Sequence, residues 1–402
     1  MMSKLVPKLR FKEFSGDWEN KTLENLSNIT MGSSPKSSFY NKNKEGVPLL
    51  QGNADIKNRK SYPRIYTTQI TKECFENDIL LSVRAPVGTV AKSNHYACIG
   101  RGISSIKAKK DNSQEWIYQW FLQFENRWSS ISQGGTFEAV NSSDIKNLNI
   151  LIPKLEEQEK IAKTLTSLDN LIEAQTKKVE TLKQHKKGLM QKLFPLEGEK
   201  KPKLRFDGFR GDWEAVKLGD ICNYSNGASH EKAIVENGKY NLISLNSLDI
   251  NGNLKYKMKK IPYNDKSLQK NDLVMVLSDV AYGNFLGLTA IIPNDNYILN
   301  QRMAGLRVKI INSINIHFLR IFINQNQKYF KQKGQGSSQL NLAKSAVTDF
   351  VIYRPKPKEQ QKIANTLSSL DNLIEAQIKK VETLKQHKKG LMQKLFVNKE
   401  EN

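Results

Sequence analysis

The sequence predicts an α+β fold built from two tandem β-rich modules and two long coiled-coil helices. Three observations carry this prediction. The stretch "SLDNLIEAQTKKVETLKQHKKGLMQKLF" (167–194) returns at 369–396 with one difference, Thr176 against Ile378. The motif "PKLRFKEFSGDWE" (7–19) returns as "PKLRFDGFRGDWE" (202–214). The segments between these repeats contain strand-like runs and share only a faint skeleton. The chain is therefore two halves with a duplicated frame and diverged inserts, which is a pseudo-twofold arrangement.

The repeats also suggest boundaries. A chain of 402 residues is long enough for two or three domains of ordinary size. We expect a first β-rich domain at 1–152, a first long helix at 153–196, a second β-rich domain at 197–354, and a second long helix with a tail at 355–402.

Both inserts contain short apolar runs typical of strands and one amphipathic run typical of a helix. In the first insert the strand-like runs are "GVPLLQG", "DILLSVRAPVGTVA" and "LNILIP", and the helical run is "QEWIYQWFLQFENRW". In the second insert they are "YNLISLN", "DLVMVLSDVAYGNFLGLTAII" and "DFVIYRP", with the helix at "NIHFLRIFINQNQKYF".

Each long helix has an apolar seam in steps of four and three, as in a coiled coil. Between Glu157 and Phe194 such a helix would be about 57 Å long at 1.5 Å per residue. The identical helices could bind each other or two copies of one partner. The two seams are Ile161, Leu165, Leu168, Ile172, Gln175, Val179, Leu182, Lys186, Leu189 and Leu193, and Ile363, Leu367, Leu370, Ile374, Gln377, Val381, Leu384, Lys388, Leu391 and Leu395.

Two pairs of residues that occur in both repeats, one of glycines and one of tryptophans, each have two possible explanations. Gly188 and Gly390 lie inside the helices, where glycine costs about 1 kcal/mol relative to alanine. Either another backbone approaches closely there, or the helix bends or frays. Trp18 and Trp213 could stack on bases, but identical residues cannot distinguish different targets, so we expect them in the core.

Lysine and arginine number 63 against 40 acidic residues, a formal charge of +23. This excess favours a polyanionic partner over a merely basic soluble protein. Cys74, Cys98 and Cys222 stand far apart and support neither a disulfide framework nor a zinc site. The N-terminus has no apolar leader and no later stretch is long and apolar enough to span a membrane, so we expect a cytoplasmic protein.

Motifs for catalysis are absent from the sequence. It contains no G-x-x-x-x-G-K-[ST] phosphate loop, no H-E-x-x-H and no proline followed by aspartate. The histidines are scattered, so a surface position is favoured over a catalytic role for each of His95, His185, His230, His317 and His387. We therefore expect no catalytic residue and no metal site.

The helix starts "EEQEKIA" (156–162) and "KEQQKIA" (358–364) each follow a proline and precede a heptad helix. With the repeats, they make the chain resemble the specificity subunit of a type I restriction-modification enzyme over nearly its whole length. The resemblance implies that the helices pack antiparallel and that each β-rich domain is a target recognition domain for one half of a bipartite sequence in double-stranded DNA. It also implies two methyltransferase subunits as partners, with restriction subunits beside them.

In this family the chemistry belongs to the partners. Adenine-N6 methylation with S-adenosylmethionine and cleavage driven by ATP with Mg are expected there, and no cofactor is expected in this chain. The sequence disfavours two other classes of protein. A coiled-coil scaffold for proteins alone would not need two diverged inserts. An enzyme with a fused methylation or nuclease domain is opposed by the short inserts.

Base edges are read by arginine on guanine and by asparagine or glutamine on adenine, and small hydroxyl residues in glycine loops can bind phosphate. We therefore expect DNA contacts from polar residues on turns beside apolar strands, although each could be an ordinary solvated turn residue. The candidates are Gln51, Asn53, Arg84, Arg101, Gln133 and Thr136 in the first insert, and Asn246, Ser278, Asp279, Gln301, Arg302, Ser337, Ser338 and Gln339 in the second.

Overall fold

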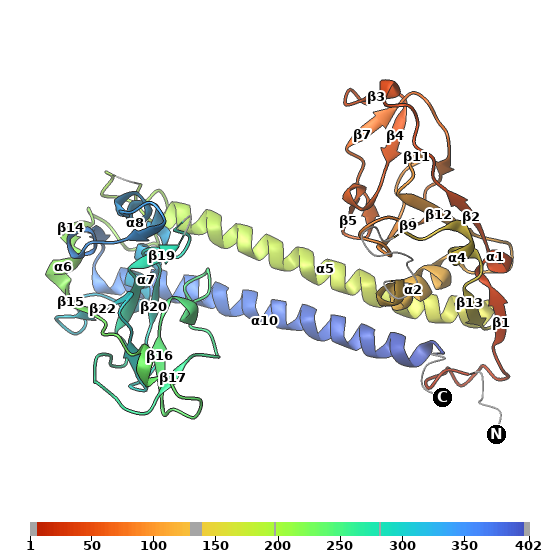
Figure 1. Cartoon of the computed structure of the whole chain (residues 1–402). Helices are drawn as coiled ribbons and strands as arrows, with labels where there is room; N and C mark the ends of the chain where they lie inside the picture. Colours follow the sequence, from red (N-terminus) through yellow and green to blue (C-terminus); the bar gives the residue numbers. More distant parts are fainter. Residues whose placement is uncertain (1–5, 129–138, 197, 281–282, 398–402) are drawn as a thin grey trace. The chain divides into compact units, whose positions relative to one another are not determined.

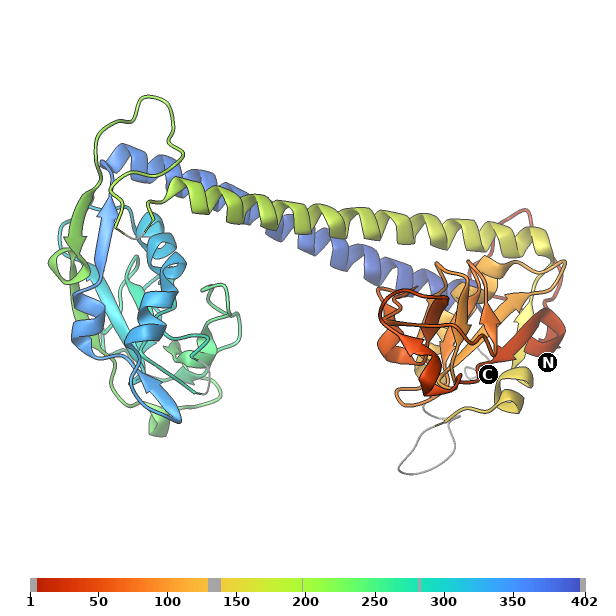
Figure 2. The same ribbon diagram turned by 90° about the horizontal axis from the view of Figure 1, so that it is seen from above.

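The computed structural model describes residues 6–128, 139–196, 198–280 and 283–397. The chain forms two compact units, a first unit of residues 1–177 with 378–402 and a second unit of residues 178–377. The two long helices, α5 (Leu155–Leu193) and α10 (Pro357–Leu395), each contribute one part to each unit (Figure 1). Both helices are uninterrupted over their length, as Figure 2 shows.

The described residues of the first unit form three sheets. Strand β1 (Glu19–Thr22) pairs antiparallel with β13 (Asn149–Ile152). A larger sheet has the order β2 (Ser27–Met31), β12 (Ile103–Ala108), β9 (Ile79–Ser82), β10 (Val90–Lys92), β6 (Lys60–Ser61) and β5 (Ile56–Lys57). The third has the order β3 (Tyr40–Asn41), β7 (Ile65–Thr67), β4 (Val47–Leu50), β11 (Ala97–Ile99) and β8 (Glu73–Cys74). The short helices are α1 (Leu23–Leu26), α2 (Gln114–Phe124) and α4 (Ser142–Lys146), with 3₁₀ turns at Ser37–Phe39, Asn53–Asp55 and Glu125–Arg127.

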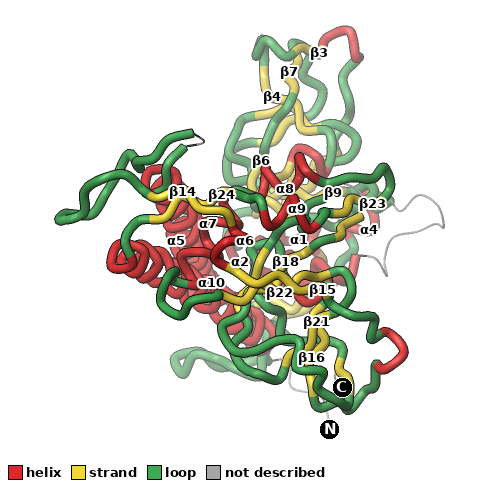
Figure 3. The backbone as a smooth tube through the Cα atoms, turned by 90° about the vertical axis from the view of Figure 1, so that its left-hand side faces the viewer, coloured by secondary structure: helices red, strands yellow, loops and turns green. Residues whose placement is uncertain are grey.

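The second unit has a similar arrangement, but its two larger sheets contain fewer strands. Strands β14 (Glu214–Lys217) and β24 (Val351–Arg354) pair antiparallel, and the central sheet has the order β15 (Cys222–Asn226), β22 (Met303–Val308), β18 (Leu273–Val276) and β20 (Thr289–Ile291) (Figure 3). Two smaller sheets are β17 (Lys260–Ile261), β16 (Tyr240–Ile243) and β21 (Tyr297–Leu299), and β19 (Ser278–Val280) with β23 (Gln339–Asn341). The helices are α6 (Leu218–Ile221), α7 (Ile316–Gln325), α8 (Gln327–Lys333) and α9 (Lys344–Thr348), with 3₁₀ turns at Glu231–Ala233 and Leu245–Ser247.

One glycine in each unit shows how closely the two plans correspond. Gly88 lies just before β10 with φ +93°, and Gly287 lies just before β20 with φ +74°. A Cβ atom on Gly88 would lie 2.6 Å from the ring of Trp128, and one on Gly287 would lie 2.4 Å from Phe330. Both the positive φ and the contact with an aromatic side chain therefore require glycine.

The C-terminal end of each long helix completes the core of a unit. In the first unit, Trp18, Trp116 and Phe396 are buried together, with ring centroids of Trp116 and Phe396 5.4 Å apart. In the second unit, Phe194 lies 6.2 Å from the ring of Trp213. Trp18 and Trp213 are 2% and 1% exposed, so their predicted place in the core is confirmed.

The predicted seams are confirmed, because every seam residue of both helices is buried or half-buried. The helices run antiparallel within each unit: Asp169 of α5 pairs with Lys388 of α10 in the first, and Lys186 of α5 pairs with Asp371 of α10 in the second. The amide oxygens of Gln175 and Gln377 are buried and accept no hydrogen bond from the described residues.

One of the two alternatives for the helix glycines, the close approach of another backbone, was wrong. A Cβ atom at Gly188 or Gly390 would meet nothing within 4 Å, so no other backbone of the described residues approaches either glycine. The helices also continue past them without a break, to Leu193 and Leu395.

The structure explains why the two repeated motifs occur together. Arg10 of "PKLRF" donates two hydrogen bonds, of 2.8 and 2.7 Å, to the carboxylate of Glu157 at the start of α5. Arg205 donates two bonds of 2.7 Å to Glu359 at the start of α10. Such two-point pairs are among the stronger ionic contacts in proteins. The arginine motif therefore binds the first turn of a long helix in each unit.

The glutamine of each helix start joins two further elements. The side chain of Gln158 donates to the Pro153 carbonyl at 2.9 Å and accepts from the Ser113 amide at 2.8 Å, immediately before α2. Gln360 makes the matching bonds to Pro355 and Asn315, both at 2.8 Å. The E-Q-x-K-I-A motif thus fixes the strand that precedes each long helix to the core helix beside it.

Candidate nucleic-acid interface

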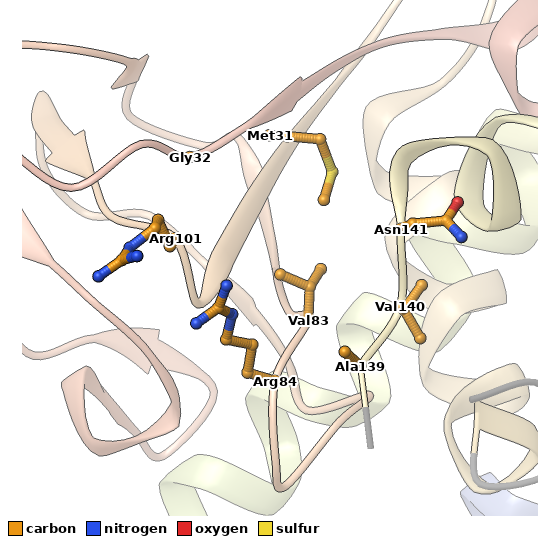
Figure 4. Close-up of a pocket in the computed structure, with 8 residues that line it drawn as sticks. All are labelled: Met31, Gly32, Val83, Arg84, Arg101, Ala139, Val140 and Asn141. Atoms are coloured by element: carbon orange, nitrogen blue, oxygen red, sulfur yellow. The ribbon is translucent and has the colours of Figure 1, made fainter. Parts of the chain in front are cut away.

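In the first unit, four segments meet at one end of the large sheet. They are the end of β2, the loop after β9, the turn between β11 and β12, and the segment that leads into α4. A hollow of about 460 Å³ lies between them (Figure 4). We call the residues that line it the first face: Met31, Gly32, Val83, Arg84, Arg101, Ala139, Val140 and Asn141.

Backbone hydrogen bonds hold these segments together. The Val83 amide donates to the Gly102 carbonyl at 3.0 Å, and the Val140 amide donates to the Val83 carbonyl at 3.0 Å. The Gly32 amide donates to Ile103 at 2.9 Å. The positions of the side chains on the first face are therefore set by a hydrogen-bonded backbone.

The turn that presents Arg101 depends on the glycine after it. The Gly102 amide donates to the Gln51 carbonyl at 3.1 Å, and a Cβ atom on Gly102 would lie 2.2 Å from that oxygen. The Arg101 amide donates to Ser34 Oγ at 3.2 Å. A tight turn packed against β4 thus exposes the side chain of Arg101 at its tip.

Arg84 and Arg101 are exposed, and they lie on the side of the hollow away from Val140 and Asn141 (Figure 4). Neither guanidinium pairs with a carboxylate among the described residues. By contrast, Arg59 pairs with Glu125 in the same unit. The first face therefore carries two positive charges that are not neutralised within the described chain, which suits an anionic or electron-rich ligand.

The second unit has a matching face on the same backbone pattern. The Leu277 amide donates to the Arg302 carbonyl at 3.0 Å, and the Leu342 amide donates to the Leu277 carbonyl at 2.8 Å. The Gly227 amide donates to Met303 at 3.1 Å. We call this the second face: Gly227, Leu277, Ser278, Gln301, Gln339, Asn341 and Leu342.

The polar side chains of the second face are neutral amides and a hydroxyl. Ser278 Oγ donates to the Asn341 side-chain oxygen, and Gln339 Nε2 donates to Ser278 Oγ. Strand β23 brings these groups together, since Ser278 pairs with Asn341 in the β19–β23 ladder. The network holds the amides of Gln339 and Asn341 in fixed orientations.

One carboxylate lies close to this face. Glu231 accepts a hydrogen bond from the Asn300 side chain at 3.0 Å, which is the main cause that lowers the pKa of Glu231. Lys259 and Arg302 lower that pKa further. Among the described residues, the ion-pair partner of Glu231 is Lys259, at 3.4 Å, and Arg302 makes no ion pair with this carboxylate.

The remaining sequence candidates have varied surroundings. Gln51 lies beside the Arg101 turn and donates from its side chain to the Tyr40 hydroxyl at 2.9 Å. Asn53 is half-buried at the start of a 3₁₀ turn, and Asn246 is exposed in the corresponding turn of the second unit. Ser337 and Ser338 are exposed before β23.

Asp279 and two loop residues differ from the others. Asp279 is buried, and its carboxylate accepts the amides of Val280 and Phe285, both at 2.8 Å, so it organises the loop after β19. Gln133 and Thr136 lie outside the described residues.

Sequence reasoning missed Gly32, Gly227 and Asn341. The two glycines follow β2 and β15 as "MG" and "NG", and their equivalent positions appear only when the diverged inserts are aligned through backbone pairing. Asn341 lies in a strand of three residues whose partner is 63 positions earlier. A non-local pairing of this kind leaves no local signal in the sequence.

Within the described ranges, no group of three or more His, Cys, Asp or Glu residues has the arrangement of a metal site. The helices of the same ranges include none that is long and apolar enough to cross a membrane.

Comparison with known proteins identifies the family. The model of the type I restriction modification DNA specificity domain matches twice, at residues 15–184 and 210–385. A Methanocaldococcus jannaschii protein assigned as the specificity subunit of type I restriction enzyme MjaX is 39% identical over 47% of this chain, and the match spans 45% of that relative's length. The MjaVIII specificity subunit of the same organism is 27% identical over 68% of this chain and 67% of its own.

Solved structures share the fold. The crystal structure of the type I restriction-modification S subunit from M. genitalium has a TM-score of 0.65 at 17% identity and covers 98% of this chain and 99% of that one. A structure on complex assembly of a type I system has a TM-score of 0.59 at 17% identity, covering 94% and 97%. Because the family model matches most of the chain in two copies, the chain belongs to the type I restriction-modification DNA specificity subunits.

Proposed function

We propose that this subunit reads a bipartite sequence in double-stranded DNA, with residues 1–152 and 197–354 as its two target recognition domains. Specificity subunits are the non-catalytic members of these systems. One observation carries the proposal: the first and second faces share their backbone hydrogen bonds but differ in their side chains. The same frame with different polar groups is what reading two different half-sites requires.

The charge of the chain supports a DNA partner. A formal charge of +23 attracts the phosphate backbone, and this attraction weakens steeply as salt rises. On the first face, Arg84 and Arg101 add local positive charge where bases would be read. A scaffold that binds only proteins would not require different polar side chains on the two faces.

The partners follow from the family. We propose that two methyltransferase subunits bind one chain, because the structure contains two copies of the helix start and two copies of the arginine motif bound to it. In this proposal the partners hold S-adenosylmethionine and methylate adenine at N6, and restriction subunits use ATP and Mg to cleave. The assembly would work in the cytoplasm, where bacterial and archaeal chromosomal DNA lies.

Methylome sequencing of the host with and without this gene tests the function. A bipartite N6-methyladenine motif should be present only when the gene is intact. A salt titration of the purified complex against duplex DNA gives an independent readout, in which the logarithm of affinity should fall linearly with the logarithm of salt concentration. An unchanged methylome together with flat salt dependence would favour the protein scaffold instead.

A further inference from the structure

We infer that Arg101 and Gln301 are the paired specificity-determining residues of the two faces, Arg101 for guanine in one half-site and Gln301 for adenine in the other. This inference rests on the proposed function. It goes further because it assigns one residue and one base type to each half-site.

The two residues occupy equivalent positions. Arg101 lies in the turn between β11 and β12, and Gln301 in the turn between β21 and β22. In the first turn the Ile103 amide donates to the Gly100 carbonyl, and in the second the Met303 amide donates to the Asn300 carbonyl, both at 3.0 Å. The Gly100 amide donates to Leu50 of β4, as Asn300 donates to Ile243 of β16.

The side chains of both residues are free to bind a ligand. Arg101 and Gln301 are exposed, and neither side chain makes a hydrogen bond or an ion pair with any described residue. By contrast, Gln339 and Asn341 are engaged with Ser278 and with each other. Of the amides on the second face, Gln301 is therefore the one whose donor and acceptor are both available.

The chemistry of the two side chains selects the bases. A guanidinium offers only donors, and guanine presents two acceptors, O6 and N7, in the major groove. A side-chain amide offers one acceptor and two donors, which match N6 and N7 of adenine. The neighbouring groups reinforce this difference: Arg84 adds a second donor group to the first face, whereas Ser278 occupies the equivalent position on the second.

Arg302 is the competing candidate on the second turn. Its carbonyl accepts from Leu277, and its position corresponds to Gly102, which has no side chain. Its charge lies near enough to Glu231 to lower the pKa of that carboxyl. Because the backbone bonds match Arg302 with Gly102 and match Gln301 with Arg101, Gln301 is the better assignment.

The test exchanges the two side chains. Bound sites are selected from a randomised duplex library with the complex that contains the full-length chain, purified from its host, and with the variants Arg101→Gln and Gln301→Arg. Arg101→Gln should change a guanine to adenine in one half-site, with about 5- to 150-fold loss of preference for the original base. Gln301→Arg should change adenine to guanine in the other half-site only.

Controls separate the possible failures. Lys110→Ala removes one exposed positive charge beyond the opposite end of β12 and should leave the motif unchanged. If the wild-type complex selects no motif, the proposed function fails. If it selects a bipartite motif but either exchange lowers affinity equally for all sites, or alters the wrong half-site, the inference is overturned. The midpoint of thermal unfolding is measured for each variant. A midpoint equal to that of the wild type excludes misfolding as the cause of a changed motif.

Discussion

The ammonium group of Lys388 lies 2.7 Å from both carboxylate oxygens of Asp169, although 219 residues separate them in the chain. Lys388 occupies a seam position, where a coiled coil normally has an apolar side chain. Its side chain is 12% exposed, so the charge is largely removed from water. Asp169 also accepts a hydrogen bond from Gln119 at 2.8 Å, which links α5 and α10 to helix α2.

Reversing the charge at Lys388 should therefore destabilise the first unit. In Lys388→Asp two carboxylates would face each other, whereas the double variant Asp169→Lys with Lys388→Asp should recover part of the loss. A coupling energy of about 1 kcal/mol is expected for a partly exposed pair. Chemical unfolding of the single and double variants measures it. Lys389→Asp, at the exposed neighbouring position, is the matched control, and equal effects at both positions would contradict the role of the pair.

Truncating Phe396 should unfold the core of the first unit selectively. Phe396 is 2% exposed and packs on Trp116, and loss of a buried phenylalanine side chain costs about 3–5 kcal/mol. Hydrogen exchange in Phe396→Ala should rise in α2 and β12 but not in α7. The mirror variant Phe194→Ala should raise exchange in α7, because Phe194 packs on Phe318. Identical exchange patterns in the two variants would refute this assignment.

Removing Arg10 should be more damaging than neutralising its partner. The Glu157 side chain is 3% exposed, so Arg10→Ala leaves a buried carboxylate without its counter-ion, at a cost of about 3–5 kcal/mol. Glu157→Gln keeps the shape of the side chain and removes the charge, so a smaller loss is expected. Thermal unfolding compares the two. If Glu157→Gln lowered the thermal stability more than Arg10→Ala does, the unpaired carboxylate would not be the destabilising group in Arg10→Ala.

The buried cysteines should not react while the chain is folded. Burial is the main cause that raises the pKa of Cys74 to about 11 and that of Cys222 to about 12, so both thiols stay protonated at pH 8. Because these values lie above the unfolded value of 9.0, the stability gained by keeping the thiols neutral is present below pH 9 and is lost as pH rises through the folded pKa values. A disulfide reagent at pH 8 should react only after denaturant is added. Rapid reaction of the folded chain would contradict this burial.

The sequence predicted the long helices well, because a heptad seam is a local and periodic signal. It also placed Trp18 and Trp213 in the core from their repetition alone. It failed where contacts are non-local. The pairing of Ser278 with Asn341 and the bond between Arg10 and Glu157 join residues that no short window contains. The close approach of another backbone at Gly188 and Gly390 also failed, because the cost of glycine inside a helix is a local signal and says nothing of the neighbours, which are absent within 4 Å among the described residues.

The core of the first unit uses residues from both ends of the chain, whereas the second unit is one continuous segment, 178–377. During synthesis the second unit can close its core once its own residues have left the ribosome. The first unit must wait until Met392, Leu395 and Phe396 emerge, so its core stays open while almost the entire chain is made. A chain that stops before Met392 therefore lacks these core residues and leaves apolar surface around Trp116 uncovered, and exposed apolar surface of this kind promotes aggregation.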